Sequence, residues 1–140
     1  MCIVFYSERP PIKGIKRIII FNRDEDTRRE RSPLGVHFEP KKILCGVDLM
    51  AEGTWLGVNL ENGNFGFLTN FCDKMFVPII DPKYRRGNLL MNFLKGDSKF
   101  NSIDEYKGYL NTFLTEGDKF NGVNLWIGNM LTDNTIFTHN

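Results

Sequence analysis

Short apolar runs separated by turn residues fill the first part of the chain. Residues 2–6 (CIVFY) and 16–22 (KRIIIFN) flank the stretch PPIKG, whose prolines and glycine cannot extend a hydrogen-bonded ladder. We therefore predict two strands joined by a turn. The second run is continuously apolar, which is typical of a strand covered on both faces. The charged residues 23–31 and the SPLG stretch are predicted to form a loop, followed by a short strand at residues 42–48.

A hairpin is the clearest element of the pattern. Residues 53–60 (GTWLGVNL) and 65–71 (FGFLTNF) flank Asn62-Gly63, a pair typical of the two-residue type I′ turn. Such a turn would pair Leu60 with Phe65 and Val58 with Phe67. Alternation then divides the side chains between two sheet faces. One face is predicted to carry Trp55, Gly57, Leu68 and Asn70, and the other Thr54, Leu56, Val58, Phe65 and Phe67.

Two segments with the apolar periodicity of helices follow the hairpin along the chain. Residues 88–95 (NLLMNFLK) have an apolar stripe and end before Gly96. A second helix is predicted from Ser102, which forms an S-x-x-E capping box with Glu105. Gly117 is the expected C-cap of this helix. Its predicted buried face consists of Ile103, Tyr106, Leu110, Phe113 and Leu114.

Two further strands are predicted at residues 122–130 and 134–139. Strands, then two helices, then strands again indicate an α+β fold with a mainly antiparallel sheet. The length of 140 residues fits one domain, and the last strand is expected to leave an exposed sheet edge.

Composition and charge narrow the class of protein. The chain is 41% apolar and 25% charged with a net charge of +1, which argues against nucleic acid as the main partner. No segment is long and apolar enough to span a bilayer, and the N-terminus does not resemble a secretory signal. A cytoplasmic location is therefore expected. Cys2, Cys45, Cys72, His37 and His139 show no spacing typical of a metal site, so no metal is expected.

Cys2 is the first residue with candidate chemistry. If Met1 is removed, the freed α-amine could accept the thiol proton, and no histidine is needed. The alternative, which position alone favours, is a small residue packed in the first strand. At the end of the second strand, Arg23 could lower the pKa of a neighbouring thiol and Asp24 could bind an α-ammonium group, or both could form a solvated ion pair. Alternation places Asn22 and Asp24 on one face and Arg23 on the other.

Asn70 and Asn124 end or interrupt apolar strands. Their amides could stabilise an oxyanion, although asparagine is also common in turns and caps. Trp55 is interpreted as packing on the hairpin face rather than as a platform for a ligand.

The order of several short motifs resembles the NRDE family, whose eukaryotic members are called transport and Golgi organisation protein 2. The resemblance runs from Met1 to about Asn129. The motifs are MCI at the start, NRDE at 22–25, GVD at 46–48, GTWLG at 53–57, LTN at 68–70, RG at 86–87 and NGVNL at 121–125.

The resemblance implies an N-terminal-nucleophile hydrolase-like αββα sandwich. Residues 1–140 would form a single NRDE-family domain, about half of the usual family length, so the sandwich would be incomplete at its C-terminal side. Exposed apolar sheet and self-association are then expected. By analogy with that fold, the catalytic candidates are Cys2, Arg23, Asp24, Asn70 and Asn124.

Two functions remain open from the resemblance. One is a binding and trafficking factor in Golgi and secretory organisation that handles haem or lipid, with haem as a cargo and no cofactor required. Golgi, mitochondrial or peripheral membrane association would accompany it. The other is a Cys2-dependent hydrolase of a non-peptide amide bond.

Overall fold

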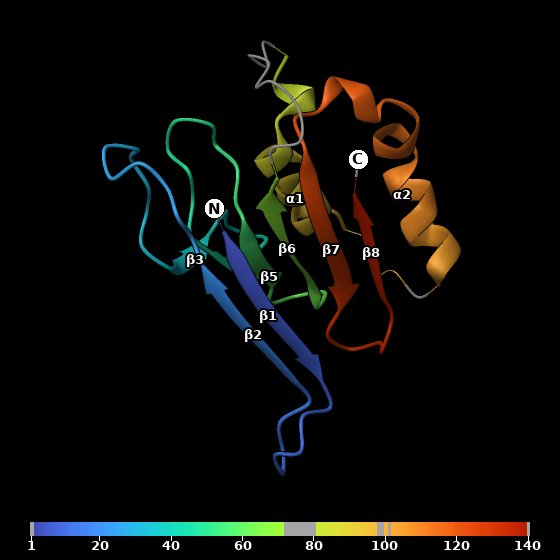
Figure 1. Ribbon diagram of the computed structural model, residues 1–140. Helices are drawn as coiled ribbons and strands as arrows, with labels where there is room; N and C mark the ends of the chain where they lie inside the picture. Colours follow the sequence, from blue (N-terminus) through green and yellow to red (C-terminus); the bar gives the residue numbers. More distant parts are fainter. Residues whose placement is uncertain (1, 72–80, 98–99, 101, 140) are drawn as a thin grey trace.

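The computed structural model describes residues 2–71, 81–97, 100 and 102–139. Six strands are followed by the helices and then by two more strands, which is the order expected of an α+β chain (Figure 1). In chain order they are β1 (Ile3–Glu8), β2 (Arg17–Asn22), β3 (Gly35–His37), β4 (Ile43–Cys45), β5 (Leu56–Asn59), β6 (Asn64–Asn70), the 3₁₀ helix η1 (Pro82–Tyr84), α1 (Arg86–Lys95), α2 (Ile103–Thr115), the 3₁₀ helix η2 (Gly117–Lys119), β7 (Val123–Asn129) and β8 (Thr135–His139).

Three layers make up the described fold. The central layer is a six-stranded antiparallel sheet in the order β3-β4-β5-β6-β7-β8. Helices α1 and α2 cover one face of it, and the antiparallel β1–β2 hairpin lies on the other (Figure 1). The α+β class and the antiparallel pairing are therefore confirmed, and β8 is an edge strand as predicted.

The hairpin between β5 and β6 has a different register from the predicted one. Val58 pairs with Phe65 and Leu56 with Phe67, so four residues, 60–63, connect the strands. The Asn59 side-chain oxygen accepts hydrogen bonds from the backbone N–H groups of residues 61 and 62, which favours the longer loop. Gly63 has a positive φ of 80°. The shift is two residues, so the predicted division of side chains between the faces is preserved.

The predicted helices are present with small changes at their ends. Helix α1 begins two residues earlier than expected and ends before Gly96. The Ser102 hydroxyl accepts a hydrogen bond from the Glu105 N–H, as the capping box predicts. Gly117 is not a C-cap, because it begins η2.

The core lies between the helices and the larger sheet. Leu90, Phe93 and Leu94 of α1 are fully buried, and so are Tyr106 and Leu110 of α2. The prediction was wrong for two residues of the α2 face, because Ile103 and Leu114 are exposed. Helix α2 lies at the β8 edge, where it has less sheet to cover (Figure 1).

The β1–β2 hairpin is not covered on both faces, contrary to the sequence prediction. Its inner face contacts the larger sheet through Tyr6, whose ring centre lies 4.9 Å from that of Trp126. On its outer face, Ile3, Phe5 and Ile20 are more than half exposed. Apolar sheet is thus exposed, as the resemblance led us to expect.

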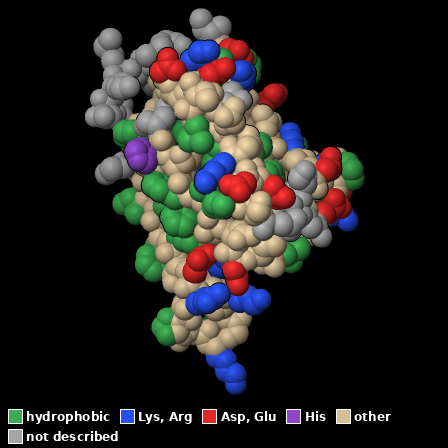
Figure 2. Space-filling model, turned by 90° about the vertical axis from the view of Figure 1, so that its right-hand side faces the viewer, with side chains coloured by type: hydrophobic (Ala, Val, Ile, Leu, Met, Phe, Trp, Pro, Cys, Tyr) green, Lys and Arg blue, Asp and Glu red, His purple; other side chains and the backbone are tan. Residues whose placement is uncertain are grey.

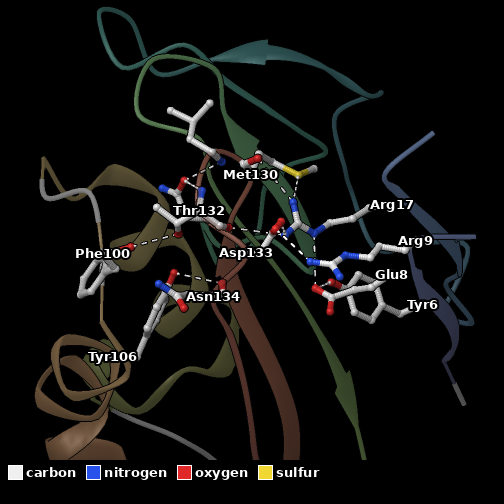
Figure 3. Close-up of polar contacts among 12 residues, drawn as sticks. Tyr6, Glu8, Arg9, Arg17, Phe100, Tyr106, Met130, Thr132, Asp133 and Asn134 are labelled. Atoms are coloured by element: carbon white, nitrogen blue, oxygen red, sulfur yellow. Dashed lines mark hydrogen bonds and ion pairs between the residues drawn. The ribbon is translucent and has the colours of Figure 1, made fainter. Parts of the chain in front are cut away.

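A buried arginine fastens this hairpin to the turn between β7 and β8. Arg17 donates to the backbone carbonyls of Met130 and Thr132 and pairs with the carboxylates of Glu8 and Asp133 (Figure 3). Only 6% of its side chain is exposed. The hairpin is therefore held at a fixed position on the sheet.

The loop predicted for residues 23–35 contains more structure than expected. Residues 35–37 form β3, which pairs with β4, and Arg31 forms an isolated bridge with Asp48. The predicted strand at residues 42–48 is shortened to Ile43–Cys45. The Ser32 hydroxyl accepts from the Val47 N–H and thereby attaches the loop to the chain after β4.

Candidate functional site

A cavity of about 550 Å³ opens where β1 begins and β2 ends. Cys2 immediately precedes β1 and Arg23 immediately follows β2, and the pairing of Ile3 with Asn22 brings both residues to the same end of the hairpin. The cavity wall comes from both sheets, η1 and the start of α1. It consists of Cys2, Arg23, Glu25, Arg29, Asp48, Met50, Ala51, Gly53, Thr54, Trp55, Leu68, Asn70, Tyr84, Arg85, Arg86, Gly87 and Asn121.

The motifs that carry the family resemblance converge on this cavity. Each of the seven contributes at least one residue to the cavity wall, although the motifs are spread over residues 1–125. They are represented by Cys2, Arg23 and Glu25, Asp48, Gly53 to Trp55, Leu68 and Asn70, Arg86 and Gly87, and Asn121. The cavity is therefore the strongest candidate for the functional site.

Arg23 is the central side chain of the site. Its guanidinium carbon lies 3.9 Å from the ring centre of Trp55, a cation–π contact. Nη2 lies 3.1 Å from a carboxylate oxygen of Glu25 and 3.5 Å from one of Asp48. Nη1 is buried and has no hydrogen-bond acceptor among the residues that the structure describes. A buried charged donor without an acceptor is unfavourable, so this atom is available for an additional partner.

Asp48 holds together the part of the cavity wall that follows β4. Its Oδ2 accepts from Nε of Arg29 at 2.6 Å, while its Oδ1 accepts from the backbone N–H groups of Met50 and Ala51. These contacts fix the loop after β4 and leave both carboxylate oxygens occupied. Asp48 is consequently a positioning residue for Arg23 and Arg29.

Two close approaches of backbone shape the remaining wall. A Cβ on Gly53 would lie 2.6 Å from the carbonyl carbon of Gly87, and a Cβ on Gly46 would lie 2.9 Å from the Trp55 ring. The Thr54 hydroxyl donates to the Gly46 carbonyl, and the Thr54 N–H donates to the Gly87 carbonyl. The glycines of the GVD, GTWLG and RG motifs thus bring the segment before β5 against the start of α1.

The electrostatic balance of the wall is positive. It contains four guanidinium groups, two carboxylates, and no lysine among the described residues. Glu25 and Asp48 lie within 4.0 Å of the guanidinium nitrogens of Arg23 or Arg29. The other two guanidinium groups belong to Arg85 and Arg86 at the start of α1, and Arg86 also donates to the Gly122 carbonyl. Such a wall favours an anionic group.

Three of the five predicted catalytic candidates line the cavity, and two do not. Cys2, Arg23 and Asn70 lie in its wall. Asp24 is exposed and is not among the residues that line the cavity. A hydrogen bond and the charge of the amino terminus lower the pKa of its carboxyl. Asn124 donates to the Thr69 hydroxyl on the sheet face opposite Asn70.

Several residues of the cavity wall are not predicted from the sequence as site residues. The pattern predicts only a packing role for Trp55, and Arg29, Asp48 and Arg86 are not among the predicted candidates. Asp48 and Arg86 lie in the GVD and RG motifs, which are the available sequence signal. Asn121, rather than Asn124, is the asparagine of NGVNL that reaches the cavity.

The other cysteines and the histidines lie elsewhere. Cys45 is buried in the core, where burial raises the pKa of its thiol, and Cys72 lies outside the described residues. His37 contacts the Ser32 hydroxyl, and His139 lies on the edge strand β8. In the described part of the chain, no group of three or more acidic, cysteine or histidine side chains could hold a metal ion. No described helix has the length and apolar character needed to cross a membrane.

Comparison with protein families identifies the family of this chain. The model described as Transport and Golgi organisation 2 matches residues 1–140, which is the whole chain. None of the curated proteins compared with this chain matches it.

Proposed function

The chain belongs to the Transport and Golgi organisation 2 family, which implies a role in transport and Golgi organisation, and we propose that it acts there as a small-molecule binding factor. The ligand we propose is an amphipathic anion, such as haem with its two propionates or an acyl lipid. It would bind in the cavity between Cys2, Arg23 and Trp55.

The observation that carries this proposal is the unpaired Nη1 of Arg23. Its neighbouring Nη2 is already paired, so Nη1 can form a charge-assisted hydrogen bond to a carboxylate or phosphate without breaking an existing contact. Arg85 supplies a further guanidinium group in the same wall. An anionic head group would therefore be favoured at this end of the ligand.

The rest of the wall suits an apolar body. Trp55, Leu68, Met50 and Ala51 provide ring, aliphatic and thioether surface beside the arginines. The volume of about 550 Å³ lies within the usual range for small-molecule sites of about 300–1,000 Å³. Polar and apolar surfaces in one cavity favour an amphipathic ligand over a simple inorganic anion.

Calorimetric titration with hemin and with palmitate tests the proposal. We expect the wild-type chain to bind at least one of the two, and Arg23→Gln to weaken binding by about tenfold or more through loss of the charged donor. Arg28→Gln is the matched control, because Arg28 lies in the same charged segment, pairs with Asp26 and is outside the cavity wall. Absence of binding for both probes, or equal loss in the two variants, would contradict the proposal.

The Cys2-dependent hydrolase is the second candidate function. The supporting observation is that Cys2 shares the cavity with Arg23 and Asn70. In such a reaction the sulfur would attack the amide carbonyl carbon, the C–N bond would break, and the amine would leave with a proton. Water would then release the acid from the thioester.

This alternative requires a free α-amine on Cys2. Intact-mass measurement tests whether Met1 is removed, and a retained Met1 excludes the self-base mechanism. The unused buried donor of Arg23 supports the binding function over the hydrolase. The αββα sandwich, the cytoplasmic location with Golgi or mitochondrial association, and haem as cargo remain predictions.

A further inference from the structure

The tip of the β1–β2 hairpin is an exposed basic and apolar projection. Residues 9–16 (RPPIKGIK) contain three basic residues and no acidic one, although the whole chain has a net charge of only +1. Ile12 and Ile15 are 50% and 43% exposed. Figure 1 shows this hairpin extending beyond the larger sheet, and Figure 2 shows basic side chains gathered at the same end of the molecule.

A tight turn places the two isoleucines side by side. The Ile15 N–H donates to the Ile12 carbonyl, and Gly14 between them has a φ of +84°. This is the pattern of a β-turn that needs a positive φ at its third position. Ile12 and Ile15 therefore occupy the two ends of the turn, with Lys13 at its second position and Lys16 directly after it.

The base of the tip is rigidly attached to the body. Arg17 is held by the β7–β8 turn (Figure 3). The Arg9 N–H donates to the Lys16 carbonyl at 2.7 Å, which closes the loop. The nearest acidic groups, Glu8 and Asp133, pair with Arg17, and Asp133 also pairs with Arg9. Lys13 and Lys16 are exposed beyond these pairs.

We propose that this tip is a membrane-docking element that inserts Ile12 and Ile15 into the interface of a bilayer with anionic lipids. Lys13 and Lys16 would lie at the level of the negatively charged head groups. Side chains that are apolar at the turn and basic around it match the two parts of such an interface. This inference is independent of the cavity, which lies at the opposite end of the hairpin.

An anionic membrane explains the tip better than a second copy of the chain. Two tips that met would bring like charges together, and each isoleucine would have to be buried beside a lysine. A bilayer accepts both kinds of side chain at different depths. Apolar residues on the outer face of the hairpin, Ile3, Phe5 and Ile20, extend the exposed apolar surface toward the cavity end.

Sedimentation with vesicles tests the proposal on the full chain. We expect strong binding to phosphatidylcholine vesicles that contain about 30% phosphatidylserine, weak binding to pure phosphatidylcholine, and a decrease with added salt. Lys13→Gln with Lys16→Gln should lower the partition coefficient by roughly fivefold per lysine. Ile12→Ser with Ile15→Ser retains the charge and should lower it by roughly fivefold or more.

Controls separate the tip from general effects. Leu34→Ser removes an apolar side chain that is 71% exposed in another loop, and Lys107→Gln removes an exposed charge on α2; both should bind as the wild type does. Thermal melting of every variant reports folding. The proposal would be overturned by equal binding to the two kinds of vesicle, or by tip variants that bind as the wild type does. It would also be overturned if the tip substitutions changed only the oligomeric state, measured by sedimentation velocity.

Discussion

The guanidinium carbon of Arg23 lies 3.9 Å from the ring centre of Trp55, so the end of β2 is packed directly on the start of the β5–β6 hairpin. This contact joins the smaller sheet to the larger one at the mouth of the cavity. In this position Nη2 of the arginine pairs with carboxylates, while Nη1 has no acceptor among the described residues. The stability of the wall and its capacity to bind an anion therefore depend on the same two side chains.

Gly46 permits this contact, and its replacement provides the first prediction. In Gly46→Ala the new Cβ would lie 2.9 Å from Cζ2 of Trp55, so the indole must shift and its packing against Arg23 is disturbed. We expect a loss of about 1–2 kcal/mol in the free energy of unfolding, measured by urea denaturation. Gly108→Ala is the control with the opposite sign. It lies on the exposed side of α2 with nothing within 4 Å of the new Cβ, and should stabilise the chain by roughly 0.5–1 kcal/mol.

Local patterns in the sequence predicted most of the elements, because short-range rules determine them. The capping box at Ser102 and the end of α1 at Gly96 were readable in this way. The register of β5 and β6 could not be predicted in this way, because the side-chain hydrogen bonds of Asn59 favour a longer loop than the Asn-Gly pair alone predicts. Face assignment survived this error, since a shift of two residues does not move side chains across a sheet.

The candidate site was less accessible to prediction. Strand alternation placed Arg23 on the opposite side from Asp24, and the structure has Arg23 in the cavity wall. Its contact with Trp55 joins residues that are 32 positions apart, and no local rule predicts such a pair. The motif order indicated which residues matter but not which of them meet.

Asp48 provides the second prediction. Asp48→Asn retains an acceptor for the backbone N–H groups of residues 50 and 51 but removes the charge opposite Arg23 and Arg29. We expect a loss of roughly 2 kcal/mol in the free energy of unfolding, below the usual cost of breaking a fully buried pair because Arg29 is partly exposed.

Asp26→Asn is the matched control for this change. Asp26 pairs with Arg28 at the surface, where solvent screens such pairs and they contribute little to stability. Urea denaturation of both variants at pH 7 gives the comparison. Equal effects in the two variants would show that the Asp48 contacts are no stronger than a surface ion pair.

A buried asparagine provides the third prediction. Asn59 is almost fully buried, and its Nδ2 donates to the Leu94 carbonyl at the end of α1 while its Oδ1 organises the hairpin loop. Asn59→Ala leaves these groups without partners and should cost about 2–4 kcal/mol of unfolding free energy. Asn92→Ala, on the exposed side of α1, should change stability by less than about 0.5 kcal/mol. Thermal melting of the two variants separates a structural asparagine from an ordinary helical one.

Buried phenols provide the last prediction, which concerns alkaline pH. Burial raises the pKa of Tyr106 to about 12 and also raises those of Tyr109 and Tyr6 above the ordinary value of about 10. The folded chain keeps these groups protonated while the unfolded chain ionises them. Their stabilising effect is therefore complete below about pH 10 and is lost as the pH rises toward the folded pKa values.

Tyr109→Phe isolates one of these groups. Tyr109 donates to the Leu89 carbonyl at 2.7 Å, so the variant should lose about 1 kcal/mol at pH 8. Above pH 10 its unfolding free energy should fall less steeply than that of the wild type, by up to about 1.4 kcal/mol per pH unit for one proton. Denaturation curves at pH 8 to 11.5 measure both slopes, and the lysines titrate equally in the two chains. Parallel slopes would mean that Tyr109 ionises as readily in the folded chain as in the unfolded one.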